Sequence, residues 1–263
     1  MIYNKLLVAK HTRSLEHPYY FCTGYFIPIA NELRKEKYNK TMFVVRECGP
    51  MTPWLESLKN KYPITIKKPG LVLKYYLLGM QNVVFDYWEK SEKFDTEEFK
   101  DSISFLKNIY NLSTNKNKNK IGILNRNKPS LFYLNDAEIP LDKTQLPTRS
   151  INNIEELNKN ISKNYDSELI DTSNTDPESA IKIYSNLNIL IGQWGAGLTN
   201  MIWMDAGSLI IEISTQRKDP NYTFDKLAKA LGHNFIRVYA QESWTGDVNV
   251  KLIMDILKKE RSL

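Results

Sequence analysis

Short apolar runs alternate with longer segments whose apolar residues recur at helical spacing along most of the chain. In the first half this pattern predicts strands at 5–10, 41–46, 64–66 and 82–86, and helices at 24–36, 52–59 and 96–110. In the second half it predicts strands at 121–124, 168–171, 187–191, 209–213 and 235–238, and helices at 154–163, 177–185, 198–204 and 222–231. Strands that alternate with helices favour an α/β fold with parallel sheets and right-handed crossovers.

A polar segment at 113–120 reads Ser-Thr-Asn-Lys-Asn-Lys-Asn-Lys and contains no apolar residue, which is typical of a linker. The 263 residues exceed the about 100–150 of a common single domain. We therefore predict two Rossmann-like domains that face one cleft, with boundaries at 1–115 and 116–263. An amphipathic helix at 250–259 is expected to pack on the body of the protein, with packing back on the N-terminal domain as one arrangement.

Composition narrows the class of protein. Hydrophobic residues make up 42% of the chain, enough for a sizeable core, and no apolar run reaches the about 18 residues of a membrane span. The first residues lack the pattern of a secretory signal, so we expect a cytoplasmic protein. A net charge of +6 suits an anionic ligand or a solvated Lys-rich surface. Nucleic-acid binding is not expected, because no basic stripe carries interleaved aromatic residues.

Residues 187–213, LNILIGQWGAGLTNMIWMDAGSLIIEI, carry the clearest chemical signal. An apolar strand leads into a turn with Gly192, Gly195 and Gly197, and a helix is expected to begin near Leu198. Glycines allow a sharp turn and close approach of a ligand, and a helix N-terminus offers N–H groups to an anion. The segment predicts a diphosphate site at the carboxyl end of a parallel strand. Because the full G-x-G-x-x-G fingerprint is absent, a tight turn without a ligand is the alternative.

The same segment resembles the C-terminal motif of glycosyltransferase family 61, which reads His-Gly-Ala-Gly-Leu-Thr-Asn, an apolar stretch, a glycine and a strand that ends in Glu. The matching residues are Gly195, Ala196, Gly197, Leu198, Thr199, Asn200, Gly207 and Glu212. Residues 124–126, 135–138 and 227–238 resemble further family patterns. Three positions depart from the family: Trp194 replaces the histidine, Asn188 replaces a common acid, and Phe21 falls where a histidine is usual in the first helix.

The resemblance implies a GT-B enzyme that inverts the anomeric centre and transfers a sugar from a UDP-sugar, such as UDP-xylose or UDP-N-acetylglucosamine, to a glycan acceptor. It also implies that neither a metal ion nor another cofactor is needed, and the chain contains no Asp-x-Asp motif. Residues 1–115 would then face the acceptor and residues 116–263 would bind the nucleotide sugar.

Individual residues receive roles on this hypothesis. Arg126 follows a strand and suits a diphosphate, since a guanidinium binds phosphate in a fork geometry. Trp194 is a candidate for stacking on the base or the sugar. Thr199 and Asn200 are expected to bond the phosphate or the sugar, and Glu212 to accept from ribose or sugar hydroxyls.

An inverting transferase needs a base to take the proton of the acceptor hydroxyl. His11 follows the first predicted strand, and Glu47 follows the second. The sequence does not rank one above the other. A catalytically inactive protein that binds a sugar nucleotide or a glycan is the alternative function, and the missing histidines motivate it.

Overall fold

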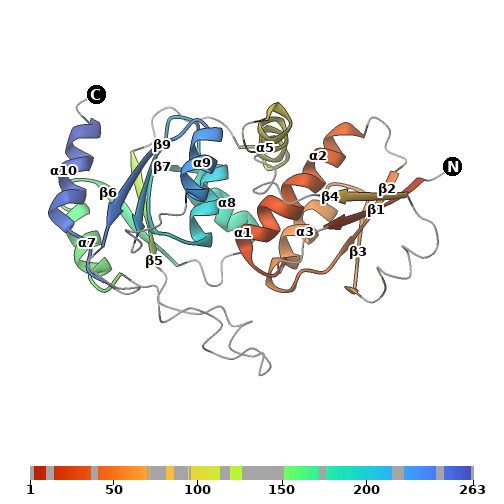
Figure 1. Ribbon diagram of the computed structural model, residues 1–263, viewed down its shortest axis with the longest axis horizontal. Coiled ribbons are helices and arrows are strands. Elements are labelled where there is room, and N and C mark those ends of the chain that lie inside the picture. The colour runs from red at the N-terminus through yellow and green to blue at the C-terminus, as the bar shows by residue number, and fades with distance from the viewer. Residues whose placement is uncertain are drawn as a thin grey trace, which may run out of the picture. The chain divides into compact units, whose positions relative to one another are not determined.

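The computed structural model describes residues 3–9, 15–36, 41–69, 71, 81–85, 94, 96–112, 119–125, 151–171, 176–214, 222–240 and 246–261. The chain forms two compact units: Met1–Ser113 together with Asp176–Glu178, and Thr114–Thr175 together with Ser179–Leu263. Each unit contains one sheet with helices against it (Figure 1). Every strand pair in the two sheets is parallel, which confirms the predicted α/β class. Among these residues, no helix is long and apolar enough to cross a membrane.

The sheet of the first unit has the strand order β3-β2-β1-β4. Its strands are β1 (Tyr3–Ala9), β2 (Thr41–Arg46), β3 (Ile64–Lys67) and β4 (Gln81–Phe85). The helical segments are α1 (Pro18–Phe21), η1 (Cys22–Phe26), α2 (Ile27–Lys35), η2 (Gly49–Met51), α3 (Thr52–Lys59) and α5 (Glu97–Ile109). The predicted bounds of β2 and α3 are confirmed. Both elements have clear local signals, because β2 is a short apolar run and α3 has a proline in its first turn.

The first helix begins at Pro18 and not near residue 24 as predicted, and its middle part, η1, is π-helical. Tyr25 in η1 explains what this segment does in the fold. Its side chain is fully buried, and its hydroxyl donates to the Leu7 carbonyl and accepts from the Arg46 N–H, both at 3.0 Å. One phenol therefore ties the helix to β1 and to the end of β2.

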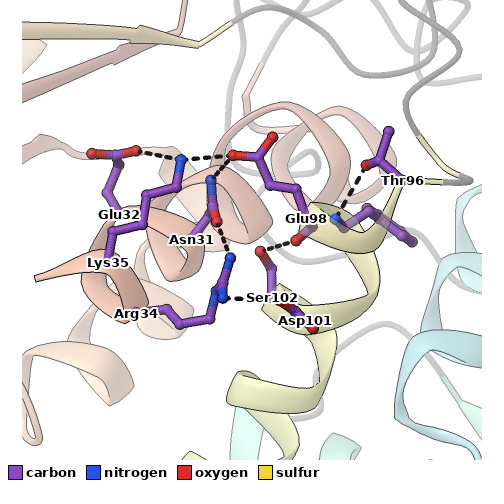
Figure 2. Close-up of polar contacts among 9 residues, drawn as sticks. Asn31, Glu32, Arg34, Lys35, Thr96, Glu98, Asp101 and Ser102 are labelled. Atoms are coloured by element: carbon purple, nitrogen blue, oxygen red, sulfur yellow. Dashed lines mark hydrogen bonds and ion pairs between the residues drawn. The ribbon is translucent and has the colours of Figure 1, made fainter.

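Helices α2 and α5 meet through a polar network, which Figure 2 shows. Asn31 and Lys35 both donate to the carboxylate of Glu98, the Lys35 contact at 2.7 Å. Arg34 pairs with Asp101 at 2.9 Å and also donates to the Asn31 side chain at 3.2 Å. The charged members are half-exposed, so each ion pair contributes only about 0.2–1 kcal/mol.

Thr96 caps α5, and its hydroxyl accepts from the Phe99 N–H at 3.3 Å (Figure 2). This bond satisfies one of the N–H groups that a helix start leaves without a partner. The polar segment that follows α5 is shorter than the predicted linker, because Lys120 already belongs to a strand of the second unit.

The sheet of the second unit has the strand order β6-β5-β7-β8-β9. Its strands are β5 (Lys120–Asn125), β6 (Asp166–Asp171), β7 (Leu187–Gln193), β8 (Leu209–Ser214) and β9 (Asn234–Tyr239). The helical segments are α7 (Ile154–Ile161), α8 (Pro177–Ser185), η4 (Ala196–Trp203), α9 (Thr223–Ala230) and α10 (Val250–Arg261). The predicted bounds of α8 are confirmed.

Alternation along β7 and β8 gives the two faces of this sheet different chemistry. On one face, isoleucines such as Ile191 and Ile211 form a core with α7 and α10. Ile253 and Leu257 of α10 are fully buried in that core, so the apolar side of this helix packs on the sheet of the second unit. Figure 1 shows α7 and α10 on this face of the sheet. The opposite face carries buried apolar residues, such as Leu190 and Ile210, together with the polar residues Glu212 and Arg237.

Candidate functional site

The glycine turn lies at the carboxyl end of β7, a central strand of the second sheet. The Trp194 N–H donates to the Ile213 carbonyl at 2.9 Å, which ties the start of the turn to β8. Gly195 has φ 157° and ψ 176°, a conformation that is nearly restricted to glycine. The helix η4 starts at Ala196, and the Leu198 N–H makes its first bond, to the Gly195 carbonyl at 3.0 Å. The preceding N–H groups, of Ala196 and Gly197, have no intrahelical acceptor.

The helix after the turn differs from the prediction in type and start. An α-helix was expected from about Leu198, but η4 is a 3₁₀ helix that begins at Ala196. Its buried residues include Leu198, Met201, Ile202 and Trp203. Most of this eight-residue segment therefore packs against the protein, and only its first turn remains for a ligand.

The three glycines of the turn have different structural roles. A Cβ on Gly192 would lie 2.5 Å from the Cδ1 atom of Leu124, so this glycine is required for packing of β7 against β5. Gly195 provides the unusual backbone angles. Gly197 is not among the glycines with positive φ, so backbone strain is no reason for glycine there. Ala196 and Gly197 are both half-buried, which leaves their backbone partly accessible.

Thr199 and Asn200 have opposite surroundings, although they are neighbours in η4. The Asn200 side chain donates to the Gly197 carbonyl at 3.1 Å and is hydrogen-bonded to the Tyr184 hydroxyl. Its amide therefore holds the turn in shape. The Thr199 side chain is buried, and its hydroxyl has no partner among the residues that the structure describes. A buried hydroxyl without a partner is costly unless a ligand or a water supplies one.

Glu212 and Arg237 form an ion pair on the face of the second sheet that lies opposite α7 and α10. Glu212 is opposite Gly192 in the β7–β8 register and opposite Arg237 in the β8–β9 register. The Arg237 Nε atom lies 2.5 Å from Glu212 Oε1, and the Glu212 side chain is fully buried. Within the described part of the chain, nothing donates to Glu212 Oε2. Burial raises the pKa of Glu212 above its ordinary value, although Arg237 opposes this shift.

Aromatic rings connect this ion pair to the glycine turn. The Trp194 and Phe224 rings meet edge to face, with centroids 6.2 Å apart, so the first turn of α9 touches the glycine turn. Tyr222 directly precedes α9, and the Arg237 guanidinium lies 5.2 Å from the centroid of its ring. Sequence reasoning missed Tyr222, Phe224 and Arg237. No local pattern marks them, because the register of β8 with β9 and the fold of α9 bring them together.

Of the two candidate bases, Glu47 lies in the described part of the first unit. Its N–H donates to the Lys67 carbonyl at 2.9 Å, and its own carbonyl accepts from Arg46 Nε at 3.4 Å. The backbone is thus fixed at the carboxyl edge of the first sheet. The half-buried side chain has no hydrogen bond or ion pair to any described residue. His11 and Arg126 lie outside the described residues.

In the described segments, no group of three or more His, Cys, Asp or Glu residues is arranged to hold a metal ion. His233 is buried, and its Nε2 atom lies 3.0 Å from the Met201 carbonyl oxygen. It thus connects the start of β9 to η4. The candidate site of the second unit therefore consists of the glycine turn, the Glu212–Arg237 pair and the nearby aromatic rings.

A parallel α/β unit with a glycine turn at the carboxyl edge of its sheet is a common architecture for nucleotide binding. The comparison with protein families is more specific. The model of the family described as Glycosyltransferase 61 matches residues 80–211, about half of the 263 residues. The chain belongs to this family and is a glycosyltransferase. The matched range contains the whole glycine turn and ends one residue before Glu212. No curated protein matches the chain significantly.

Proposed function

We propose that the protein transfers a sugar from a UDP-sugar, of the UDP-xylose or UDP-N-acetylglucosamine class, to a glycan acceptor, with inversion and without a metal ion. The glycine turn carries this proposal. It lies at the carboxyl end of a central parallel strand in a chain that belongs to a glycosyltransferase family. Open α/β sheets bind nucleotides at that edge.

The diphosphate of the donor is assigned to the first turn of η4. The N–H groups of Ala196 and Gly197 precede the first hydrogen bond of the helix, so they are available to phosphate oxygens. The Thr199 hydroxyl, which lacks a protein partner in the described region, is the nearest side-chain donor along η4. These groups would meet the charge of the diphosphate by hydrogen bonding, as oxyanion sites do.

The acceptor side of the reaction is assigned to the first unit. Glu47 is our choice of base over His11, because its backbone is fixed at the carboxyl edge of the sheet and its carboxylate has no described partner. A carboxylate in such a position is able to take the proton of an acceptor hydroxyl. On this proposal the two units are the two Rossmann-like domains of a GT-B enzyme.

Calorimetric titration with UDP in excess EDTA tests the proposal. We expect saturable binding by the wild type, and weaker binding by the Thr199→Val variant, which keeps the shape of the side chain and loses its hydroxyl. Thr41→Val, the same change at a buried threonine in β2 of the first unit, is the matched control and should bind UDP normally. Binding that requires Mn²⁺ or Mg²⁺, or no binding at all, would contradict the proposal.

A protein that binds a sugar nucleotide without turnover is the second candidate, and one observation favours it. Trp194 stands where the resembled family motif has histidine, and its ring packs against Phe224. The two candidates differ in a transfer assay with a panel of UDP-sugars and glycan acceptors. Release of UDP that depends on the acceptor supports the enzyme, and NMR of the product gives the anomeric configuration. Tight UDP binding with no release under any pairing supports the binding protein.

A further inference from the structure

Tyr222 is the most exposed of the large hydrophobic side chains in the described part of the chain, with 55% of its surface accessible. It is nevertheless held in place. The Arg237 guanidinium lies over its ring, 5.2 Å from the centroid. More than half of the surface of this residue therefore remains accessible although the guanidinium lies over the ring. A rigid aromatic face that is open to solvent is suited to stacking with another planar group.

The support beneath this ring is unusually firm for a surface residue. Glu212, fully buried, holds the Arg237 Nε atom at 2.5 Å. The Phe235 ring also contacts this guanidinium, with its centroid 5.6 Å from Arg237 Cζ. The Arg237 side chain is therefore fixed by a buried carboxylate and an aromatic ring.

The position of Tyr222 connects it to the glycine turn. It precedes the first residue of α9, and Phe224, two residues further on, meets Trp194 of the turn. The start of α9 lies at the carboxyl edge of the sheet, since the opposite end of the helix returns to the amino end of β8. The bond from the Asn234 N–H to the Ser208 carbonyl, 2.9 Å, shows this return. Tyr222 and the turn thus share one edge of the sheet.

We propose that the open face of Tyr222 is the stacking platform for the uracil base of the donor, with Arg237 as its positioning residue. This inference rests on the proposed function, because it assumes a UDP-sugar whose diphosphate occupies the glycine turn. Trp194, the stacking candidate from the sequence, is half-buried and is engaged with Phe224. Tyr222 therefore offers the more accessible ring. An acceptor sugar is the competing occupant, and it is less well supported because the ring adjoins the turn assigned to the donor.

Binding of UDP and of inorganic pyrophosphate, which has no base, separates the platform from the phosphate site. Three variants are compared with the wild type: Tyr222→Ala, Tyr222→Phe, and Leu252→Ala on α10, a control at a side chain that is 43% exposed. We expect Tyr222→Ala to weaken UDP binding at least about fivefold, the loss typical of one stacked base. Pyrophosphate binding should be unchanged. Tyr222→Phe and Leu252→Ala should bind both ligands as the wild type does.

Saturation-transfer NMR gives a second readout that loss of packing alone would not produce. In the wild type the uracil protons of bound UDP should receive strong saturation, and in Tyr222→Ala their signal should fall relative to the ribose protons. Equal UDP affinity of Tyr222→Ala and wild type overturns the inference and leaves the proposed function intact. So does an equal loss for UDP and pyrophosphate, or a loss confined to the KM of the glycan acceptor. A wild type that binds no UDP contradicts the proposed function itself.

Discussion

The two units differ in where they place polar and charged side chains. In the first unit a neutral hydroxyl, that of Tyr25, makes two hydrogen bonds to the backbone, both at 3.0 Å. The charged pairs between α2 and α5 remain at the surface. In the second unit a carboxylate and a guanidinium are buried together. In that unit, Glu212 Oε2 and Thr199 Oγ1 have no partner among the described residues.

Arg34 Nε of the first unit also has no partner among the described residues, but it belongs to the network of α2 and α5. The exceptions at Glu212 and Thr199 lie near the glycine turn, where the donor site is proposed. Buried polar groups are almost always hydrogen-bonded, and each exception needs an explanation. The satisfied hydroxyl of Tyr25 stabilises a fixed arrangement of β1, β2 and the first helix. The oxygens of Glu212 and Thr199 that have no partner among the described residues reduce stability unless something binds there. The proposed donor site in the second unit would account for them.

The largest expected effect is on catalysis and concerns the first unit. Glu47→Gln removes the proposed base while keeping its size, so kcat should fall by about 10²–10⁴-fold, with UDP affinity unchanged. Glu56→Gln, an exposed residue of α3, is the matched control and should keep full activity. Steady-state kinetics with the best donor and acceptor give the measurement. If the Glu47→Gln variant keeps the activity of the wild type, Glu47 is not the base.

The next effect is on stability and concerns the second unit. Arg237→Ala leaves the buried Glu212 carboxylate without its cation, which should cost about 3–5 kcal/mol of unfolding free energy. Urea unfolding measures the loss, and hydrogen exchange should place it in β8. The double variant Arg237→Met/Glu212→Leu should regain most of the stability. A loss of unfolding free energy below about 1 kcal/mol for Arg237→Ala would show that the pair is solvated. The two units would then not differ in the burial of their ion pairs.

A smaller loss of stability is expected in the first unit. Tyr25→Phe deletes a hydroxyl and leaves the Leu7 carbonyl and the Arg46 N–H without it, at a cost of about 1–3 kcal/mol. Hydrogen exchange should increase in β1 and at the end of β2. Tyr222→Phe removes an exposed hydroxyl and serves as the control, with stability near that of the wild type. If the stability and hydrogen exchange of Tyr25→Phe equal those of the wild type, water replaces the hydroxyl of Tyr25.

The smallest effect is expected at the network of α2 and α5. Asp101→Asn breaks the contact with Arg34 at the surface, so it should change the unfolding free energy by about 0.2–1 kcal/mol. The difference from the wild type should shrink in 1 M NaCl, where exposed charges are screened. Thermal unfolding at two salt concentrations is sufficient. A loss as large as that of Arg237→Ala, at either salt concentration, would contradict the division between surface and buried pairs.

Local sequence signals were enough for most elements of the fold. The bounds of β2, α3 and α8 agree with the prediction because each has a short apolar or amphipathic pattern with a clear start. The cap of α5 is also local, because the Thr96 hydroxyl acts within three residues of its own position. The glycine turn was found for the same reason, since a strand, three glycines and an apolar helix follow one another directly.

The exceptions are segments in which packing outweighed local preference. The π-helical part of the first helix places Tyr25 between β1 and β2, and the 3₁₀ helix after the turn buries Leu198 and Trp203. Neither helix type has a pattern that distinguishes it from an α-helix in the sequence. Gly192 shows the same limitation, because its role is set by Leu124 on a neighbouring strand.

The sequence by itself determined the α/β class, the position of the glycine turn and the family resemblance that the family comparison confirms. Only the tertiary structure decided what surrounds that turn. Glu212 and Arg237 are 25 residues apart in the chain, and the parallel register of β8 and β9 alone makes them partners. Tyr222 gained its supporting guanidinium in the same way. Periodicity and turn residues act over a few positions, whereas a binding site depends on contacts between strands whose order the sequence does not state.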